Sequence, residues 1–306
     1  MLDIGSNTVH LLIVDAHVGG APLPAVSHKT VLRLSEQTSK SGRIRAEAVA
    51  ELVGFIRDSL LVAEDMGVTE VMAFATSAIR SAVNGEALLG DVAAQTGVHV
   101  ALLTGDEEAR LTFLAVRRWF GWSAGRLLVA DIGGGSLELA VGSDEDPEAA
   151  FSLDVGAGRL TSRYVDADPP SPDALRAMRK QVRAQIGDVV GGIRRAGVPR
   201  KAVATSKTFR QLARIAGAAP GSDGPFVPRS LTRADVRTWV PALAAMSEPE
   251  RSRLPGVSEG RAAQLLAGAV VAEATMDLLD IEEFDLCPWA LREGIILRKL
   301  DVLQDS

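Results

Sequence analysis

The chain has 306 residues, of which 47% are hydrophobic, and its formal net charge is −6. This length and apolar content favour two domains, each with its own hydrophobic core. The single cysteine, Cys287, excludes a disulfide framework and a zinc site made of cysteines. The negative charge argues against nucleic acid or membrane as a partner. Because we find neither an apolar run of 18 residues nor a signal peptide, we expect a soluble, cytoplasmic protein.

The first half of the chain predicts an α/β domain over residues 1–122, because strand patterns alternate with helical ones. The expected elements begin with a strand ending at Asp3, a turn and a return strand up to Asp15, a strand over 29–34, a polar loop over 35–45 and a helix over 46–67. They continue with a strand over 70–75, a turn over 76–80 that opens a helix, a strand over 98–103, and a helix from 104 to about 120.

The second half predicts a further α/β domain over residues 123–306. The expected elements begin with a strand ending at Asp131, a return strand over 138–141, a strand over 151–155, a glycine-rich turn over 156–161 and a proline-rich loop over 166–172. They continue with a helix over 173–196, a strand over 201–204, a helix that ends near 215, helices over 232–246 and 259–280, and a last helix over 289–300. We expect this last helix, about 290–304, to pack back on the first domain.

One feature occurs twice, at Asp3 and at Asp131, which lie 128 residues apart (131 − 3). In each copy an aspartate closes an apolar strand, a turn of small residues follows, and an apolar strand returns. Glycine lets successive backbone N–H groups approach an anion closely, which suits phosphate. Carboxylates beside a phosphate are explained by a divalent cation between them. The alternative is a pair of hairpins in which glycine only makes a tight turn.

Two further segments contain candidate residues. Arg80 follows a strand at a turn that opens a helix, where an anion can bind, although a surface ion pair is an equally good explanation. Glu108 lies in the first turn of a predicted helix, behind Asp106 and Glu107. Helix capping explains these two neighbours well, because acidic residues favour a helix N-terminus, and it explains Glu108 less well. The four histidines are scattered without metal-ligand spacing, so we interpret them as structural.

Five ordered motifs resemble the exopolyphosphatase/guanosine pentaphosphate phosphohydrolase family. They are the Asp3-Ile-Gly-Ser-Asn-Thr opening, Thr76-Ser-Ala-Ile-Arg80, Gly105-Asp-Glu-Glu-Ala-Arg110, Asp131-Ile-Gly-Gly-Gly-Ser-Leu-Glu138 and Ala290-Leu-Arg-Glu-Gly294. The resemblance spans nearly the whole chain and is strongest to the short, two-domain members. It implies two ribonuclease-H-like domains of the actin-like ATPase superfamily with a cleft between them.

The resemblance also implies roles for individual residues. Glu108 matches the catalytic glutamate that activates or positions water, and Arg80 matches an arginine near the terminal phosphate. The remaining matches are a phosphate-binding set, Gly5, Ser6, Asn7, Gly133, Gly134, Gly135 and Ser136, and a magnesium-binding set, Asp131, Glu138 and Asp3. At Lys207 the chain departs from the family, which usually has a small residue there. A lysine at this point crowds a purine base and can bind phosphate.

The implied reaction is Mg²⁺-dependent hydrolysis of the terminal phosphoanhydride of inorganic polyphosphate, with Mn²⁺ as the alternative ion. Guanosine pentaphosphate (pppGpp) hydrolysis, an actin-like ATPase and a non-catalytic polyphosphate sensor are the alternatives. The oligomeric state, monomer or homodimer, is left open. Basic residues that are candidates for binding the rest of the phosphate chain are Arg117, Arg118, Arg159, Arg194, Arg195 and Lys207, although a solvated helix face is the better explanation for each arginine pair.

Overall fold

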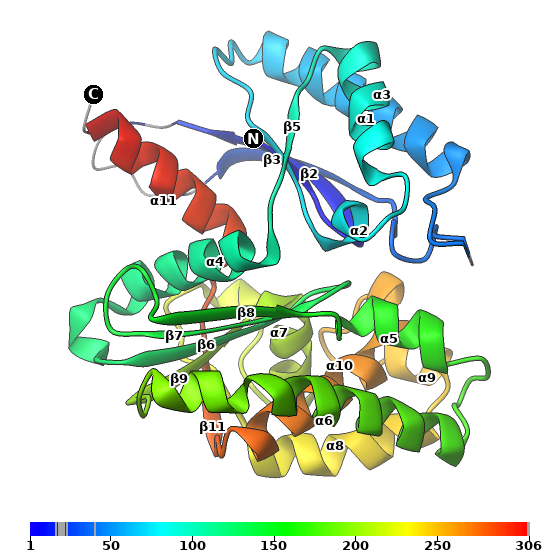
Figure 1. The fold of residues 1–306 in the computed structure, drawn as a ribbon, viewed down its shortest axis with the longest axis vertical. Coiled ribbons are helices and arrows are strands. Elements are labelled where there is room, and N and C mark those ends of the chain that lie inside the picture. The colour runs from blue at the N-terminus through cyan, green and yellow to red at the C-terminus, as the bar shows by residue number, and fades with distance from the viewer. Residues whose placement is uncertain (16, 18–21, 23, 40, 305–306) are drawn as a thin grey trace. The chain divides into compact units, whose positions relative to one another are not determined.

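The structure is a computed structural model that describes residues 1–15, 17, 22, 24–39 and 41–304 (Figure 1). The chain divides into two compact units. Unit 1 consists of Met1–Glu108 and Ile295–Ser306, and unit 2 consists of Ala109–Gly294. Each unit is built on one mixed β-sheet with helices, so the predicted α/β class is confirmed. In the described part of the chain, no helix has both the length and the apolar character needed to cross a lipid bilayer.

Unit 1 contains a five-stranded sheet in the order β3-β2-β1-β4-β5. Its elements are β1 (Leu2–Ile4), β2 (Thr8–Val14), β3 (Pro24–Val31), α1 (Ala46–Asp65), β4 (Ala73–Ala75), α2 (Ser77–Arg80), α3 (Gly85–Thr96) and β5 (Val100–Leu102), with parts of α4 (Gly105–Phe120) and α11 (Leu291–Gln304). Strands β1, β2 and β3 are antiparallel neighbours, and β1, β4 and β5 run parallel.

The core of unit 1 lies between the sheet and the helix pair α1 and α3, which lie side by side (Figure 1). Leu2 and Ile4 of β1 point to this face, where Leu52 and Ile56 of α1 and Leu88 of α3 are also fully buried. The spacing of Leu52 and Ile56 is one helical turn, so both lie on one face of α1. Helix α3 is capped at its C-terminus by Gly97, whose φ of 72° is a left-handed conformation that glycine adopts without strain.

Unit 2 contains a six-stranded sheet in the order β10-β11-β9-β6-β7-β8. Its elements, besides parts of α4 and α11, are β6 (Leu127–Ile132), β7 (Leu137–Gly142), β8 (Ala149–Leu153), α5 (Ala157–Tyr164), α6 (Pro172–Arg195), β9 (Lys201–Thr205), α7 (Ser206–Ile215), β10 (Ser230–Thr232), α8 (Arg233–Ala245), α9 (Glu248–Ser252), α10 (Glu259–Leu278) and β11 (Glu283–Leu286), with 3₁₀ turns Trp122–Ala124 and Gly221–Asp223.

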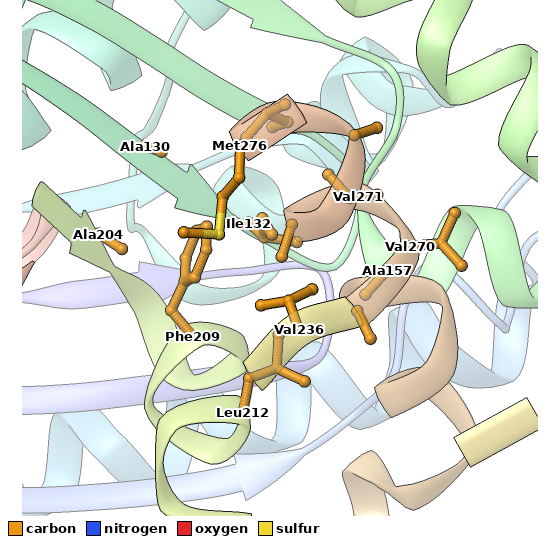
Figure 2. Packing of buried hydrophobic residues seen from close by; sticks show 14 of the residues in the cluster. Ala130, Ile132, Ala157, Ala204, Phe209, Leu212, Val236, Val270, Val271 and Met276 are labelled. Carbon is orange, nitrogen blue, oxygen red and sulfur yellow. The ribbon is translucent and has the colours of Figure 1, made fainter. Parts of the chain in front are cut away.

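Strand β6 is apolar except for Asp131 near its end, because both of its faces are covered. Leu127 and Val129 belong to a small cluster with Phe113 and Val116 of α4, on one face. Ala130 and Ile132 belong to the main core on the other face. There they pack with residues of α7 and α10 that include Phe209 and Met276 (Figure 2).

The two sheets repeat the same topology, because β6, β7, β8, β9 and β11 follow the connection order of β1, β2, β3, β4 and β5. The register repeats as well. Asp3 lies opposite His10, and Asp131 lies opposite Glu138, with the same separation of seven residues. The internal repeat inferred from the sequence is therefore a repeat of the fold.

Several details differ from the predictions. Strand β3 begins at Pro24 rather than at Lys29, because it is a largely exposed edge strand that gives no apolar signal. Strand β4 begins at Ala73 rather than at Glu70. The segment 156–161, predicted as a glycine-rich turn, instead leads directly into helix α5, since only its first residue, Gly156, stays outside the helix. Strands β10 and β11 were missed because they are short, and β11 alternates with charged residues.

Candidate active site

The turn between β1 and β2 is closed by one backbone hydrogen bond, from the N–H of Gly5 to the carbonyl of Thr8 at 3.1 Å. Ser6 and Asn7 lie in this turn and are buried. Their carbonyls accept hydrogen bonds from the loop after β3, Ser6 from the Ser35 N–H at 3.1 Å and Asn7 from the Arg33 N–H at 2.9 Å. Hydrogen bonds from another segment of the protein thus fix the backbone of the turn, so the turn is formed without a ligand.

The equivalent turn of unit 2 has the same closure, from the N–H of Gly133 to the carbonyl of Ser136 at 2.9 Å. Here the start of α5 holds the turn. The N–H of Ala157 donates to Gly133 O at 3.0 Å, and the N–H of Arg159 donates to Gly134 O at 2.9 Å. The Nε of Arg159 also donates to Gly135 O at 2.8 Å.

Gly156 fits closely against this turn, and the sequence predictions did not give it this role. A Cβ on Gly156 would lie 2.3 Å from Gly135 C and 2.5 Å from Gly135 N, distances that real Cβ atoms do not show. The two glycines of Gly156-Ala157-Gly158 are the sequence feature that could have indicated this close packing, because glycine at the start of a helix often marks a place where two backbone segments approach closely.

The carboxylates of unit 2 lie on neighbouring strands. Asp131 and Glu138 face each other across the β6–β7 hairpin, and residues in this relation lie on one face of the sheet. Glu138 is buried and accepts a hydrogen bond from Ser152 Oγ at 2.9 Å. Burial raises the pKa of Asp131 to about 6, against the lowering effect of nearby Arg210, Arg261 and Arg292.

Arg80 and Glu108 form an ion pair within unit 1, which the sequence did not predict. The same nitrogen of Arg80, Nη1, donates to the carbonyl of Leu103 at 2.7 Å, so the guanidinium is fixed at the end of β5. Glu108 is only 6% exposed. Its neighbour Glu107 instead caps helix α4, accepting from the Thr104 N–H at 2.7 Å.

A hydroxyl pair connects the first turn to the segment that carries Arg80. Ser6 Oγ and Ser77 Oγ are 2.9 Å apart, and both residues are buried. Ser77 begins α2, the short helix that ends at Arg80. The structure therefore brings together the Gly5–Thr8 turn, Ser77, Arg80 and Glu108 in unit 1.

Most of the basic residues suggested for binding the rest of the phosphate chain make contacts within the protein instead. Arg117 is 1% exposed and donates to the carbonyls of Gly121, Gly125 and Gly142, so it is neither a ligand group nor part of a solvated face. Arg118 pairs with Glu145, and Arg159 holds the glycine turn. Lys207 is exposed in the first turn of α7.

Among the described residues there is no group of three or more His, Cys, Asp or Glu side chains arranged to hold a metal ion. Two facing carboxylates are nevertheless a sufficient protein contribution for Mg²⁺, which usually keeps several waters and takes its other ligands from substrate phosphates. The oxygen-only pair Asp131 and Glu138 fits this ion in its chemistry and does not fit a zinc site.

Comparison with known proteins gives a consistent result. The model of the Ppx/GppA phosphatase family matches residues 13–303. Exopolyphosphatase 1 of Mycobacterium bovis is 52% identical over 306 residues, which cover 100% of this chain and 89% of that protein. Exopolyphosphatase 2 of Mycobacterium tuberculosis is 30% identical and is covered to 94%. The crystal structure of an exopolyphosphatase from Cytophaga hutchinsonii superposes with a TM-score of 0.87 at 25% identity, covering 98% of this chain and 97% of that one.

Proposed function

The chain belongs to the Ppx/GppA phosphatase family, and on this premise we propose that it is an exopolyphosphatase. It hydrolyses the terminal phosphoanhydride of inorganic polyphosphate and releases orthophosphate. The observation that carries this proposal is the full-length identity of 52% to a protein named exopolyphosphatase, together with a doubled aspartate–turn unit suited to phosphate.

The two turns are proposed to bind phosphate oxygens through their backbone N–H groups. In unit 1 the turn is Gly5, Ser6 and Asn7, and in unit 2 it is Gly133, Gly134, Gly135 and Ser136. The N–H groups of Gly5 and Gly133 close their turns, so the proposed donors are the N–H groups of the residues that follow them, and the two glycines allow the close approach of phosphate. The external hydrogen bonds that fix both turns support this role, because a preformed set of donors loses little freedom when an anion binds.

Asp131 and Glu138 of unit 2 are proposed to hold Mg²⁺. When bound, this ion neutralises phosphate charge and helps to align the terminal phosphoryl group. The chain's own contribution is to present the carboxylates on a rigid hairpin, which the Ser152 hydrogen bond to Glu138 supports.

Glu108 is proposed to orient the attacking water, and Arg80 to bind the terminal phosphoryl group. The water oxygen forms a bond to the terminal phosphorus, and the bridging P–O bond breaks, so that the shortened polyphosphate leaves. The water proton passes to Glu108 and then to solvent. Arg80 contacts both Glu108 and the end of β5, so the guanidinium already lies beside the residue that positions the nucleophile.

Lys207 is proposed to contact a phosphate further along the chain, since it is an exposed basic residue in the first turn of α7. A purine base would compete with it for space. We therefore place pppGpp and ATP below polyphosphate as substrates.

The test is phosphate release with Mg²⁺ from short polyphosphate, long polyphosphate, pppGpp and ATP. We expect Glu108→Gln to lower turnover on polyphosphate by about 10²- to 10⁴-fold with substrate binding retained. Glu107→Gln is the matched control, because Glu107 is an exposed neighbour that caps the helix, and it should retain turnover.

Each outcome has a clear meaning. An unchanged rate in Glu108→Gln removes Glu108 from the mechanism. Equal rates on pppGpp and polyphosphate contradict the assigned selectivity. Polyphosphate binding without any turnover in the unmutated protein identifies a sensor and contradicts the enzyme.

A further inference from the structure

The exposed side of helix α7 in unit 2 is basic along its length. The ten residues of this helix include three charged side chains, Lys207, Arg210 and Arg214, and no acidic one. Their spacing of three and then four residues places all three on one side of the helix. Lys207 and Arg210 are exposed, and Arg214 is half-buried. Only Lys207 has a role in the proposed function, so the two arginines are left without one.

The opposite side of α7 fixes which residues face solvent. Phe209 and Leu212 are fully buried in the main core of unit 2, together with Val236 and Met276 (Figure 2). A rotation of the helix that turned the basic side chains inward would take these apolar groups out of the core. The basic row is therefore a fixed surface of the fold.

The row begins beside the proposed magnesium-binding carboxylates. Asp131 of β6 pairs in register with Thr205, the residue just before α7. Thr208 Oγ1, on the buried side of α7, donates to Ile132 O at 3.0 Å and so holds the helix start against the end of β6. Burial raises the pKa of Asp131, and Arg210 opposes this rise more than any other side chain, so the Arg210 guanidinium lies near this carboxylate.

Both arginines are oriented by hydrogen bonds to backbone carbonyls. Arg210 Nε donates to Ser206 O at 3.1 Å, and Arg214 Nη1 donates to Ala218 O at 3.0 Å. Gly256 lies against the stem of Arg214, because a Cβ there would be 2.6 Å from Arg214 Cγ. Within the described residues neither arginine forms an ion pair, so their other N–H groups can meet an anion.

We propose that this basic row on α7, made of Lys207, Arg210 and Arg214, binds the polyphosphate chain beyond the phosphates held at the magnesium-binding carboxylates. The inference rests on the proposed function and adds a path for the rest of the substrate. The row rises about 10 Å along the helix axis, so an extended polyanion can contact all three cations, whereas a single phosphate cannot. A guanidinium presents paired N–H donors that suit phosphate oxygens.

The test measures binding of long polyphosphate and of pyrophosphate in EDTA, which removes Mg²⁺ and separates binding from turnover. The variant Arg210→Gln/Arg214→Gln removes two positive charges and leaves the buried side of α7 unchanged. We expect it to weaken binding of long polyphosphate by on the order of 10- to 100-fold and binding of pyrophosphate by less than about threefold. With Mg²⁺ present, KM for long polyphosphate should rise while kcat stays similar.

The matched control is Arg176→Gln/Lys180→Gln, two exposed positions one helical turn apart on α6, which removes the same charge and should keep the affinity. Melting temperatures check that each protein is folded. If the double variant on α7 unfolds, the single variants Arg210→Gln and Arg214→Gln carry the comparison, and each should still weaken long-polyphosphate binding.

The outcomes separate this inference from the proposed function. Absence of polyphosphate binding in the unmutated protein would contradict the proposed function itself. Binding that the α7 variants leave unchanged would overturn only the path along α7. An equal loss in the α6 control would also overturn it, because affinity would then follow net charge. An equal loss for pyrophosphate would place the two arginines at the terminal phosphates instead of along the chain.

Discussion

Replacing Gly156 with alanine tests whether the start of α5 holds the glycine turn of unit 2. Gly156 has φ −65° and ψ 153°, which alanine adopts freely, so the cost of the change comes from contact alone. The new Cβ would lie 2.3 Å from Gly135 C and from Ser136 N, where ordinary contacts begin at 3.4 Å. Either the turn or α5 must therefore move by about 1 Å, which costs about 1–3 kcal/mol of folding free energy.

The assay pairs urea denaturation with phosphate-release kinetics. We expect Gly156→Ala to lower the free energy of unfolding by about 1–3 kcal/mol and to raise KM for polyphosphate, because the turn loses its preformed shape. Gly187→Ala is the control. Gly187 lies inside α6, and its Cβ would have no neighbour within 4 Å, so alanine should stabilise the helix by up to about 1 kcal/mol. A Gly156→Ala protein with unchanged stability and unchanged KM would refute the reasoning.

Three more predictions concern unit 2. The pKa of Asp131 is raised from 3.8 to about 6, so ionisation of this carboxyl lowers the stability of the folded protein as the pH rises from about 4 to above 6. Asp131→Asn should therefore stabilise the metal-free protein at pH 8 by at most about 3 kcal/mol, and should not stabilise it at pH 4. Asp188→Asn, at an exposed position of α6, is the matched control in the thermal melts. Arg117→Met removes three hydrogen bonds that a buried guanidinium makes to backbone carbonyls and should cost about 2–4 kcal/mol in urea unfolding; a loss below 1 kcal/mol would contradict this. Gly294→Ala places a Cβ 1.9 Å from Leu111 O and should lower the melting temperature by several degrees, whereas an unchanged value would show that the helices separate freely.

Much of the fold could be predicted because periodicity and repetition are local signals. The helix predicted over 46–67 is α1, and the one over 173–196 is α6, each within two residues at either end. Strand β6 was visible because its apolar run reflects cover on both faces. The edge strand β3 was misplaced because exposure removes the apolar pattern on which the prediction depends.

The two turns of the candidate site could be predicted from the sequence, but the side-chain contacts around them could not. The spacing of Asp3 and Asp131 revealed two hairpins, since a repeated register leaves a repeated sequence. The Arg80–Glu108 ion pair joins residues 28 positions apart, and no pattern in the sequence specifies such a contact. Arg117 was misread because a long, charged side chain is usually exposed, and only the three-dimensional structure reveals carbonyls that pair with it.

The duplicated hairpins differ in charge at the position opposite the aspartate. Where one copy sets Glu138 opposite its aspartate, the other sets His10, whose Nε2 lies 3.1 Å from Thr8 Oγ1. A carboxylate opposite a carboxylate concentrates negative charge, and an imidazole opposite a carboxylate does not. The molecule thus contains its own reference hairpin, of the same shape but different electrostatics. Exchanging glutamate and histidine between these two positions would separate what backbone geometry contributes to ligand affinity from what charge contributes.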